Sequence, residues 1–310
     1  MKIFVLFVRE NWIIDKLASE WISHNKKLHT NNIYEADVIW VLSQYAINAS
    51  NYNIFKQKKV ITTIHHITPW KINERHFQVL NEVTDVFHVF SDKTFNTLKK
   101  YSTKPIKTIP LWHNENMWTE IKNKQVLRDK HKFAQNDFLV GSFQRDTEGA
   151  SIRTGTFEPK LEKGPDIFVK CVKLLKEKKH ANLKVILTGT RRHYIINELE
   201  KNNIEYYYFE MCDVSMLNEL YNCLDLYIVG SRVEGGPRAI NECSLNKIPL
   251  MSTDVGIANL LCEPNSIFDM NNVESILNCK TNVEYNYEKA QKYTIKNYME
   301  EFTKRLTKII

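Results

Sequence analysis

Short apolar runs alternate along this chain with longer stretches in which apolar residues recur every three or four positions. Continuous apolar runs of about four to eight residues favour buried strands, and the wider spacing favours amphipathic helices. The runs therefore predict strands in both halves of the chain. The expected strands are residues 2–8, 37–43, 59–64, 86–90, 106–109, 138–143, 183–188, 206–209, 225–229 and 248–252.

Helical spacing occupies most of the stretches between these runs. The expected helices are residues 12–24, 72–83, 92–101, 166–179, 192–202, 215–223, 238–246 and 285–309. Strands that alternate with helices form parallel sheets covered by helices on both faces. Because 310 residues are too many for one ordinary core, we expect two doubly wound α/β domains. The polar stretch 115–135 is the expected linker.

All nine glycines lie from residue 141 onward, in the expected second domain. Close approach of the backbone to a phosphate usually demands glycine. A nucleotide should therefore bind to the second domain and not to the first. The glycines are Gly141, Gly149, Gly155, Gly164, Gly189, Gly230, Gly235, Gly236 and Gly256.

The segment SRVEGGPRAINEC, residues 231–243, follows the apolar run 225–230 and predicts a strand, a turn and a helix start. Pro237 suits the first helical position, where a missing N–H costs nothing. The amides of Arg238 and Ala239 should then point out of the helix end, where the helix dipole favours an anion such as phosphate. The segment therefore predicts a phosphate site, to which Gly235 and Gly236 in the turn also belong.

Two glutamates lie on either side of this helix start. Glu234 and Glu242 have seven residues between them, and Glu242 should lie about 7.5 Å along the helix from Pro237, within reach of a ribose. Strand, Glu-Gly-x-Pro, helix and Glu together resemble the Glu-x7-Glu motif of retaining glycosyltransferases with the GT-B fold. The chain is most similar to glycosyltransferase family 4, the glycosyl transferases group 1.

This resemblance implies a fold and an activity. The GT-B fold has two Rossmann-like domains with a cleft between them. We expect an acceptor domain over residues 1–125, a nucleotide-sugar donor domain over 126–284, and a final helix over 285–310 that crosses back to the first domain. The implied enzyme moves a hexose from a nucleoside diphosphate sugar, UDP or GDP being the expected carriers, to an acceptor hydroxyl in glycan or glycolipid synthesis, and is retaining and metal-independent.

The resemblance also assigns the diphosphate to two cations, Arg145 after the first strand of the second domain and Lys163 before a helix. They would neutralise the charge that builds on the departing nucleoside diphosphate, so no metal is expected. Residues 146–162, between the two cations, form a longer segment than the family usually has. Such a long segment is expected to be a lid or an acceptor-binding loop.

The remaining roles follow from the same resemblance. Glu234 would bind sugar hydroxyls, and Glu242 would bind the ribose. His65, favoured over His66, would orient a sugar hydroxyl or manage the acceptor proton near neutral pH. Gly189 and Met211, each in a turn that follows a strand, would frame the base. Arg191 and Arg192 either project toward the base or form a solvated basic turn.

Composition and charge indicate the cellular compartment and the partners of the protein. The six cysteines stand singly without a CxxC pair, which predicts reduced thiols in a cytoplasmic protein. No apolar run approaches the roughly 18 residues of a membrane span. Residues 1–125 hold 17 Lys and Arg against 11 Asp and Glu, a net charge of +6. This excess indicates an anionic acceptor or peripheral contact with the inner face of an anionic membrane, or else a solvated surface.

Two other functions stay open, and so does the acceptor within the transferase class. A nucleotide-sugar epimerase of the same fold would need further carboxylates in the first domain, where only Glu10 stands out. A non-catalytic nucleotide-binding module would be expected to have lost one of the motif residues. Within the transferase class, the acceptor is a glycan, a lipid-linked sugar or modified DNA, and the nucleic acid is the least favoured of these.

Overall fold

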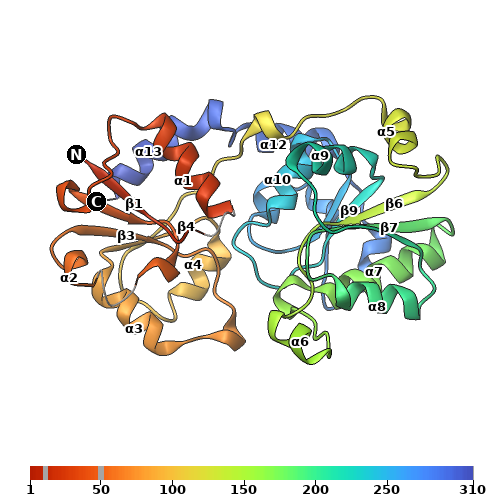
Figure 1. The fold of residues 1–310 in the computed structure, drawn as a ribbon, viewed down its shortest axis with the longest axis horizontal. Coiled ribbons are helices and arrows are strands. Elements are labelled where there is room, and N and C mark those ends of the chain that lie inside the picture. Colours follow the sequence, from red (N-terminus) through yellow and green to blue (C-terminus); the bar gives the residue numbers. More distant parts are fainter. Residues whose placement is uncertain (10–12, 48–51, 310) are drawn as a thin grey trace. The chain divides into compact units, whose positions relative to one another are not determined.

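The computed structural model describes residues 1–9, 13–47 and 52–309, and Glu10 lies outside them. The chain divides into two compact units (Figure 1). The first unit comprises Met1–Trp112 and Ile295–Ile310, and the second comprises His113–Thr294.

A five-stranded parallel sheet forms the centre of the first unit. Its order is β1-β2-β3-β4-β5, and a parallel bridge between Ile3 and His29 extends the sheet on the other side of β1. After β1 the chain first pairs with one side of this strand at His29 and then with the other side as β2. The strand β1 is therefore a switch point of the sheet. The strands are β1 (Ile3–Leu6), β2 (Val38–Val41), β3 (Lys59–Thr63), β4 (Val86–Val89) and β5 (Ile106–Thr108).

Helices cover both faces of this sheet (Figure 1). The helices α1 (Ile13–His24) and α13 (Ile295–Lys308) lie on one face, and α2 (Tyr52–Phe55), α3 (Glu74–Val83) and α4 (Asp92–Leu98) lie on the other. The first face is packed with aromatic rings, because Trp40 of β2 lies 5.4 Å from Trp21 and 5.8 Å from Phe302 between ring centres. These contacts attach α13 to the first sheet.

The second unit contains a six-stranded parallel sheet in the order β11-β10-β9-β6-β7-β8. The chain begins at the centre with β6, builds outward through β7 and β8, and then crosses to β9 on the opposite side of β6. The switch point therefore lies between β6 and β9. The strands are β6 (Phe138–Ser142), β7 (Leu183–Thr188), β8 (Tyr206–Phe209), β9 (Leu226–Val229), β10 (Leu250–Thr253) and β11 (Ile267–Phe268).

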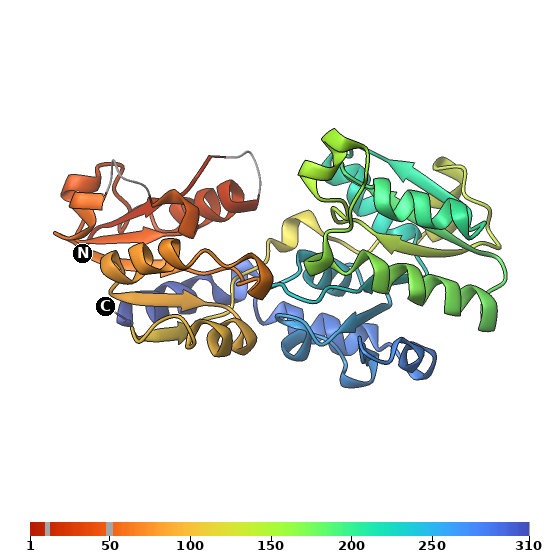
Figure 2. The same ribbon diagram turned by 90° about the horizontal axis from the view of Figure 1, so that it is seen from below.

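Helices again cover both faces. One face carries α7 (Pro165–Lys178) and α8 (His193–Lys201), which lie in front of the strands in the view from below (Figure 2). The other carries α5 (Lys124–Lys130), α9 (Val214–Cys223), α10 (Arg238–Leu245) and α12 (Val283–Gln291). The predicted class of two parallel, doubly wound α/β sheets is confirmed, and each predicted strand is present to within two residues.

The boundaries between the units differ from the expected ones after residues 125 and 284. The segment that precedes α5 belongs to the second unit, because Trp118 is buried in its core. The backbone N–H groups of Thr119 and Ile121 donate to the side chains of Asn218 and Asn222 on α9. The helix expected over 285–309 is two helices, α12 and α13, and the chain passes from one unit to the other between them.

Candidate functional site

Two predicted site residues of the second unit follow the strands at its switch point. β6 and β9 are hydrogen-bonded neighbours, with Val140 opposite Leu226. Arg145 comes after β6, and Glu234 comes after β9. Ligands of open parallel sheets bind beside the carboxyl ends of the strands at such a point. The fold therefore places both residues at the edge of the sheet where a ligand is expected.

Lys163 and Glu234 are in direct contact. Lys163 ends a short 3₁₀ helix (Leu161–Lys163), and its Nζ atom lies 2.5 Å from Oε2 of Glu234. The other carboxylate oxygen, Oε1, accepts a hydrogen bond of 2.5 Å from Oγ of Ser231. Each oxygen of Glu234 therefore has a partner, and two residues that are 71 positions apart in the sequence share one site.

The backbone brings these two segments together. Gly164 has φ of +59°, and a Cβ atom there would lie 1.8 Å from the carbonyl oxygen of Gly230, so the position requires glycine. The N–H groups of Arg232 and Val233 both donate to the carbonyl of Glu162, at 3.0 and 3.1 Å. The segment that carries Lys163 and the segment that carries Glu234 are thus joined through their main chains.

Arg232 adds a side-chain connection that the sequence analysis missed. Its guanidinium donates to both carboxylate oxygens of Asp166, at 2.7 and 2.6 Å, and to the carbonyl of Leu161 at 3.1 Å. Burial opposes ionisation of Asp166, but these bonds from Arg232 outweigh it and hold the pKa of the carboxyl below its usual value. One indication in the sequence that Arg232 belongs to the site was its position inside the SRVEGG segment.

The start of α10 differs by one residue from the prediction. Pro237 is the N-cap, with ψ of 116°, and the helix begins at Arg238. The carbonyl of Pro237 accepts a hydrogen bond from Ile240, which leaves the N–H groups of Arg238 and Ala239 in the first turn, where a helix provides no internal acceptors. The correction leaves these two amides as the ones directed out of the helix end.

A loop from β10 supports the turn before this helix. Gly256 has φ of +51°, and a Cβ atom there would lie 2.5 Å from the carbonyl oxygen of Gly235 and 2.7 Å from that of Glu234. The two backbones are therefore in close contact behind the turn. Gly236 is partly buried and connects the turn to Pro237.

Glu242 lies on α10 and has a buried tyrosine as a partner. The hydroxyl of Tyr221, on α9, donates to Oε2 of Glu242 at 2.6 Å. Burial, followed by the charge of Glu242, raises the pKa of Tyr221 well above its usual value, so the phenol stays protonated and donates. The sequence pattern marks Tyr221 only as a buried helical position and gives no sign of this contact.

The turn predicted to frame the base is held between β7 and β8. Gly189, with φ of +83°, donates its N–H to the carbonyl of Phe209 at 3.2 Å, and the hydroxyl of Tyr208 donates to the carbonyl of Gly189 at 3.1 Å. Met211 follows β8 and is 80% exposed. The structure thus places Gly189 and the chain before Met211 at the carboxyl ends of neighbouring strands.

Arg191 and Arg192 separate into two environments. Arg191 is exposed, whereas the side chain of Arg192 is 0% exposed, with Nε lying 2.8 Å from Oδ2 of the buried Asp146. Both readings from the sequence, a projection toward the base and a solvated turn, are therefore wrong for Arg192. Its charge is satisfied inside the protein.

The long segment 146–162 is folded. It contains the short helix α6 (Gly149–Thr154), and its two ends pair through a bridge between Thr147 and Pro159 (Figure 1). The N–H of Glu148 donates to the carbonyl of Glu158, and the N–H of Lys160 donates to the carbonyl of Asp146. Because the two ends of the segment are paired, its extra length lies beyond them and does not separate Arg145 from Lys163.

His65 follows β3 in the first unit. Its Nε2–H donates to the carbonyl of Leu42 at 2.8 Å, so the neutral ring carries its proton on Nε2 and offers Nδ1 as an acceptor. Burial lowers the pKa of His65 to about 4, a shift that the hydrogen bond to Leu42 opposes and the nearby His66 increases. The ring is therefore neutral at pH 7, which favours orientation of a hydroxyl over transfer of a proton.

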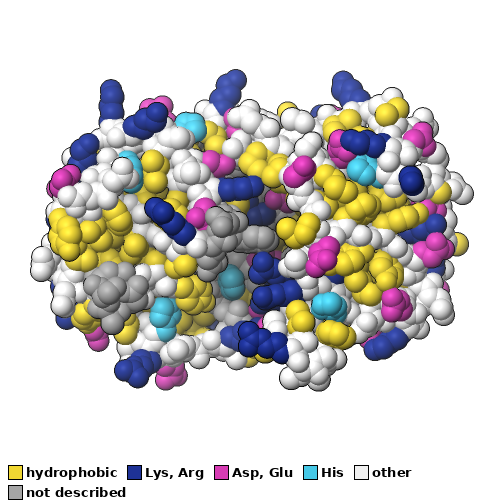
Figure 3. Space-filling model, viewed as in Figure 1, with side chains coloured by type: hydrophobic (Ala, Val, Ile, Leu, Met, Phe, Trp, Pro, Cys, Tyr) yellow, Lys and Arg dark blue, Asp and Glu magenta, His cyan; other side chains and the backbone are white. Residues whose placement is uncertain are grey.

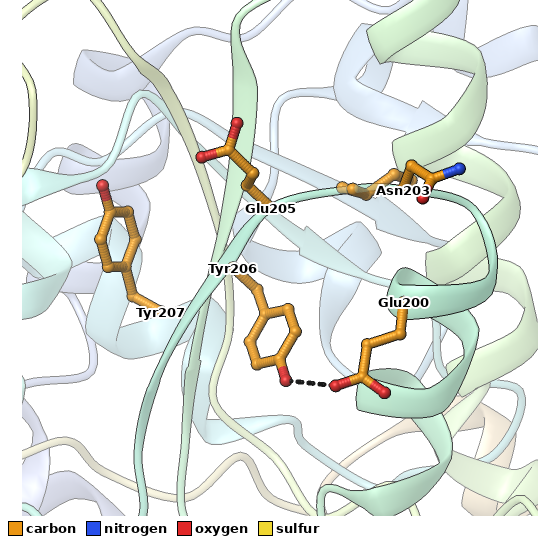
Figure 4. Close-up of a pocket in the computed structure, with 6 residues that line it drawn as sticks. Glu200, Asn203, Glu205, Tyr206 and Tyr207 are labelled. Atoms are coloured by element: carbon orange, nitrogen blue, oxygen red, sulfur yellow. Dashed lines mark hydrogen bonds between the residues drawn. The ribbon is translucent and has the colours of Figure 1, made fainter.

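A pocket of the second unit lies away from these residues (Figure 4). It is found where α8 ends and β8 begins, at the amino edge of the sheet, and the hydroxyl of Tyr206 donates to Glu200 there at 2.8 Å. No predicted site residue lines it. The lining residues are Glu200, Asn203, Ile204, Glu205, Tyr206 and Tyr207.

On the face drawn in Figure 3, lysine and arginine side chains occur on both units, with acidic side chains among them. The net charge of the chain is +7. Among the helices of the described residues, none is both long enough and apolar enough to cross a bilayer.

Two solved structures share the fold of this chain over almost its whole length. HepE from Anabaena, crystallised with UDP, is 14% identical with a TM-score of 0.75, over 99% of this chain and 100% of that one. Sucrose-phosphate synthase from Thermosynechococcus elongatus is 12% identical with a TM-score of 0.70, over 98% of this chain and 80% of that one. At these identities the likeness shows the fold, which is GT-B with two Rossmann-like units, as predicted.

A family model also matches the sequence. The model described as glycosyl transferases group 1 covers residues 145–300, which is half of the chain. The match begins at Arg145 and includes Lys163, Glu234 and Glu242. No curated protein matches the sequence.

Proposed function

The chain belongs to the glycosyl transferases group 1, and we propose that it moves a hexose from a nucleoside diphosphate sugar to an acceptor hydroxyl by a retaining, metal-independent reaction. The observation that carries this proposal is the contact between Lys163 and Glu234 at the carboxyl edge of β6 and β9. In this proposal Lys163 would bind the phosphate, and Glu234 beside it would bind the sugar hydroxyls. UDP or GDP is the proposed carrier, and the HepE structures with UDP and with UDP-glucose support UDP.

The first task of the site is to stabilise the leaving group. When the bond between the sugar and the phosphate breaks, negative charge grows on the diphosphate. Arg145, Lys163 and the amides of Arg238 and Ala239 would donate to it, and groups that are already oriented toward developing charge lower the barrier most. These cations would supply the positive charge that a metal ion supplies in other transferases.

The second task is to hold the rest of the donor. Glu234 would accept hydrogen bonds from the sugar hydroxyls, and Glu242, oriented by Tyr221, would accept them from the ribose. The turns at Gly189 and Met211 would frame the base. In the first unit, Nδ1 of His65 would accept a hydrogen bond from a sugar hydroxyl.

The acceptor is proposed from charge alone. The excess of +6 over residues 1–125 suits an anionic glycan or lipid-linked sugar, or contact with the anionic inner face of a membrane by a cytoplasmic enzyme. Partition of the protein into anionic vesicles, compared with its binding to duplex DNA, tests this choice.

A panel of donors tests the reaction. We expect UDP-glucose or a related UDP or GDP sugar to raise the melting temperature, and nucleoside diphosphate to be released when an acceptor is added. EDTA should leave the rate unchanged. Conversion of the donor sugar without release of nucleoside diphosphate would instead indicate an epimerase, and a rate lost to EDTA and restored by manganese or magnesium would overturn the metal-independent site.

A further inference from the structure

The buried side chain of Arg192 binds the loop that carries Arg145. Its Nε atom lies 2.8 Å from Oδ2 of Asp146, its Nη2 donates to Oγ of Ser142 at 3.0 Å, and its Nη1 donates to the carbonyl of Gln144. These partners lie on both sides of Arg145. The guanidinium thus donates hydrogen bonds to two acceptors before Arg145 and forms an ion pair with Asp146 after it, which fixes the path of the chain between them.

The contacts of Arg192 continue to the other site residues. Gln144, whose carbonyl is bound by Arg192, donates its side-chain amide to the carbonyl of Lys163 at 3.0 Å and to Oγ of Ser231 at 3.3 Å. Ser231 in turn donates to Glu234 at 2.5 Å. One hydrogen-bonded chain therefore connects the buried guanidinium with both members of the pair between Lys163 and Glu234.

We propose that Arg192 is a positioning residue for the transfer reaction. It orients Arg145 through the main chain on either side, and it orients Lys163 and Glu234 through Gln144. The inference rests on the proposed function, because it concerns the geometry of the same diphosphate site. Since the side chain is fully buried, Arg192 acts through its neighbours and does not touch the donor.

The chain contains a matched control at the opposite edge of the same two strands. Arg128 is also buried, with its side chain 6% exposed, and its Nη2 lies 2.6 Å from Oδ2 of Asp225. It donates further to the carbonyls of Cys223, Gln135 and Asp137. Asp137 and Asp225 directly precede β6 and β9, so this pair supports the amino ends of the strands, where no site residue lies.

The experiment compares Arg192→Lys with Arg128→Lys. A lysine keeps the charge beside the aspartate but cannot reach all of the acceptors. Both variants should unfold at a lower temperature than the wild type. Calorimetry below both transitions should show affinity for UDP or GDP reduced about ten-fold in Arg192→Lys alone, with the affinity for UMP or GMP changed less, since the loss concerns contacts to the diphosphate.

Kinetics add a second readout. Arg192→Lys should lower kcat with the best donor, whereas Arg128→Lys should keep the wild-type kcat and donor KM. Should Arg192→Lys not fold, Gln144→Met, on a partly buried loop residue, should lower kcat while the protein stays folded. Equal effects of the two arginine variants, or wild-type nucleotide affinity in Arg192→Lys, would overturn the positioning role alone. A wild-type protein that binds none of these nucleotides would overturn the proposed function and this role together.

Discussion

The Nζ atom of Lys163 lies 2.5 Å from Oε2 of Glu234, so the residues proposed to hold the phosphate and the sugar also hold each other. A change in one alters the charge and the orientation of the other. The kinetic effects of the two residues should therefore not be additive.

A double-mutant cycle measures this coupling. Lys163→Met should lower kcat by about ten- to a hundred-fold, because a donor to the leaving phosphate is lost. Glu234→Gln should also lower kcat, with little effect on the affinity for the free nucleoside diphosphate. We expect the double variant to lose less than the product of the two effects, by a coupling of about 1–3 kcal/mol. Additive losses would show that the contact has no part in the reaction.

Glu242 and Tyr221 should affect donor binding. The ribose is the same in the ground state and in the transition state, so Glu242→Gln should raise the donor KM with a smaller effect on kcat. Tyr221→Phe keeps the buried ring and removes only the hydroxyl that donates to Glu242 at 2.6 Å. It should raise KM in the same direction but by less. Steady-state kinetics with varied donor test both variants, and a fall in kcat at constant KM would assign Glu242 to another role.

Gly164 should be among the positions of the second unit that are least tolerant of a methyl group. A Cβ atom there would overlap the carbonyl of Gly230 at 1.8 Å, and the φ of +59° is unfavourable for alanine. Gly164→Ala should cost about 4 kcal/mol or more of unfolding free energy. Gly155 is the control, because its φ is +71° with no atom within 4 Å of the added Cβ, and Gly155→Ala should cost about 1 kcal/mol. Denaturant unfolding of both variants compares them.

The stability of the first unit should fall as the solution is acidified. Burial lowers the pKa of His88 to about 4, despite a hydrogen bond to Ile109, and His65 behaves in the same way. Their pKa values in the unfolded chain are about 6.5, so the unfolded state binds more protons and the folded state loses stability as the pH falls from about 6.5 toward 4. For His88 the full effect is about 3 kcal/mol.

Urea titrations at a series of pH values measure this dependence. Between pH 7 and pH 5, the unfolding free energy of His88→Gln should change less with pH than that of the wild type. This expectation holds even if the variant is less stable than the wild type at pH 7. His24→Gln, on an exposed position of α1, is the control substitution measured beside it. The same slope in His88→Gln as in the wild type would mean that His88 is not the group responsible.

The strands could be predicted from the sequence because buried parallel strands leave continuous apolar runs, as in LYIV of β9. The short helices α5 and α6 could not, since they are polar and lie in stretches expected to be a linker and a loop. The turn of residues 234–237 could be predicted from its local pattern, apart from the one-residue shift at Pro237, whose ψ of 116° lies outside the helical range.

The partners within the site could not be predicted from the sequence. The contact between Lys163 and Glu234 depends on the close approach of Gly164 and Gly230, which no local pattern describes. Charged residues in a polar turn are normally exposed, but Arg192 is buried beside Asp146, Gln144 and Ser142, which lie about fifty residues earlier in the chain. Such pairings are properties of the tertiary fold.

The assignment of α13 to the first unit has a consequence for synthesis on the ribosome. Phe302 packs against Trp40 and Trp112, and Thr303 accepts a hydrogen bond from Trp21, so the first unit cannot complete its aromatic core until α13 has been translated. The whole second unit is translated before that point. Domains usually fold in the order of their synthesis. Here the unit that is begun first can be completed only after the second unit has been translated.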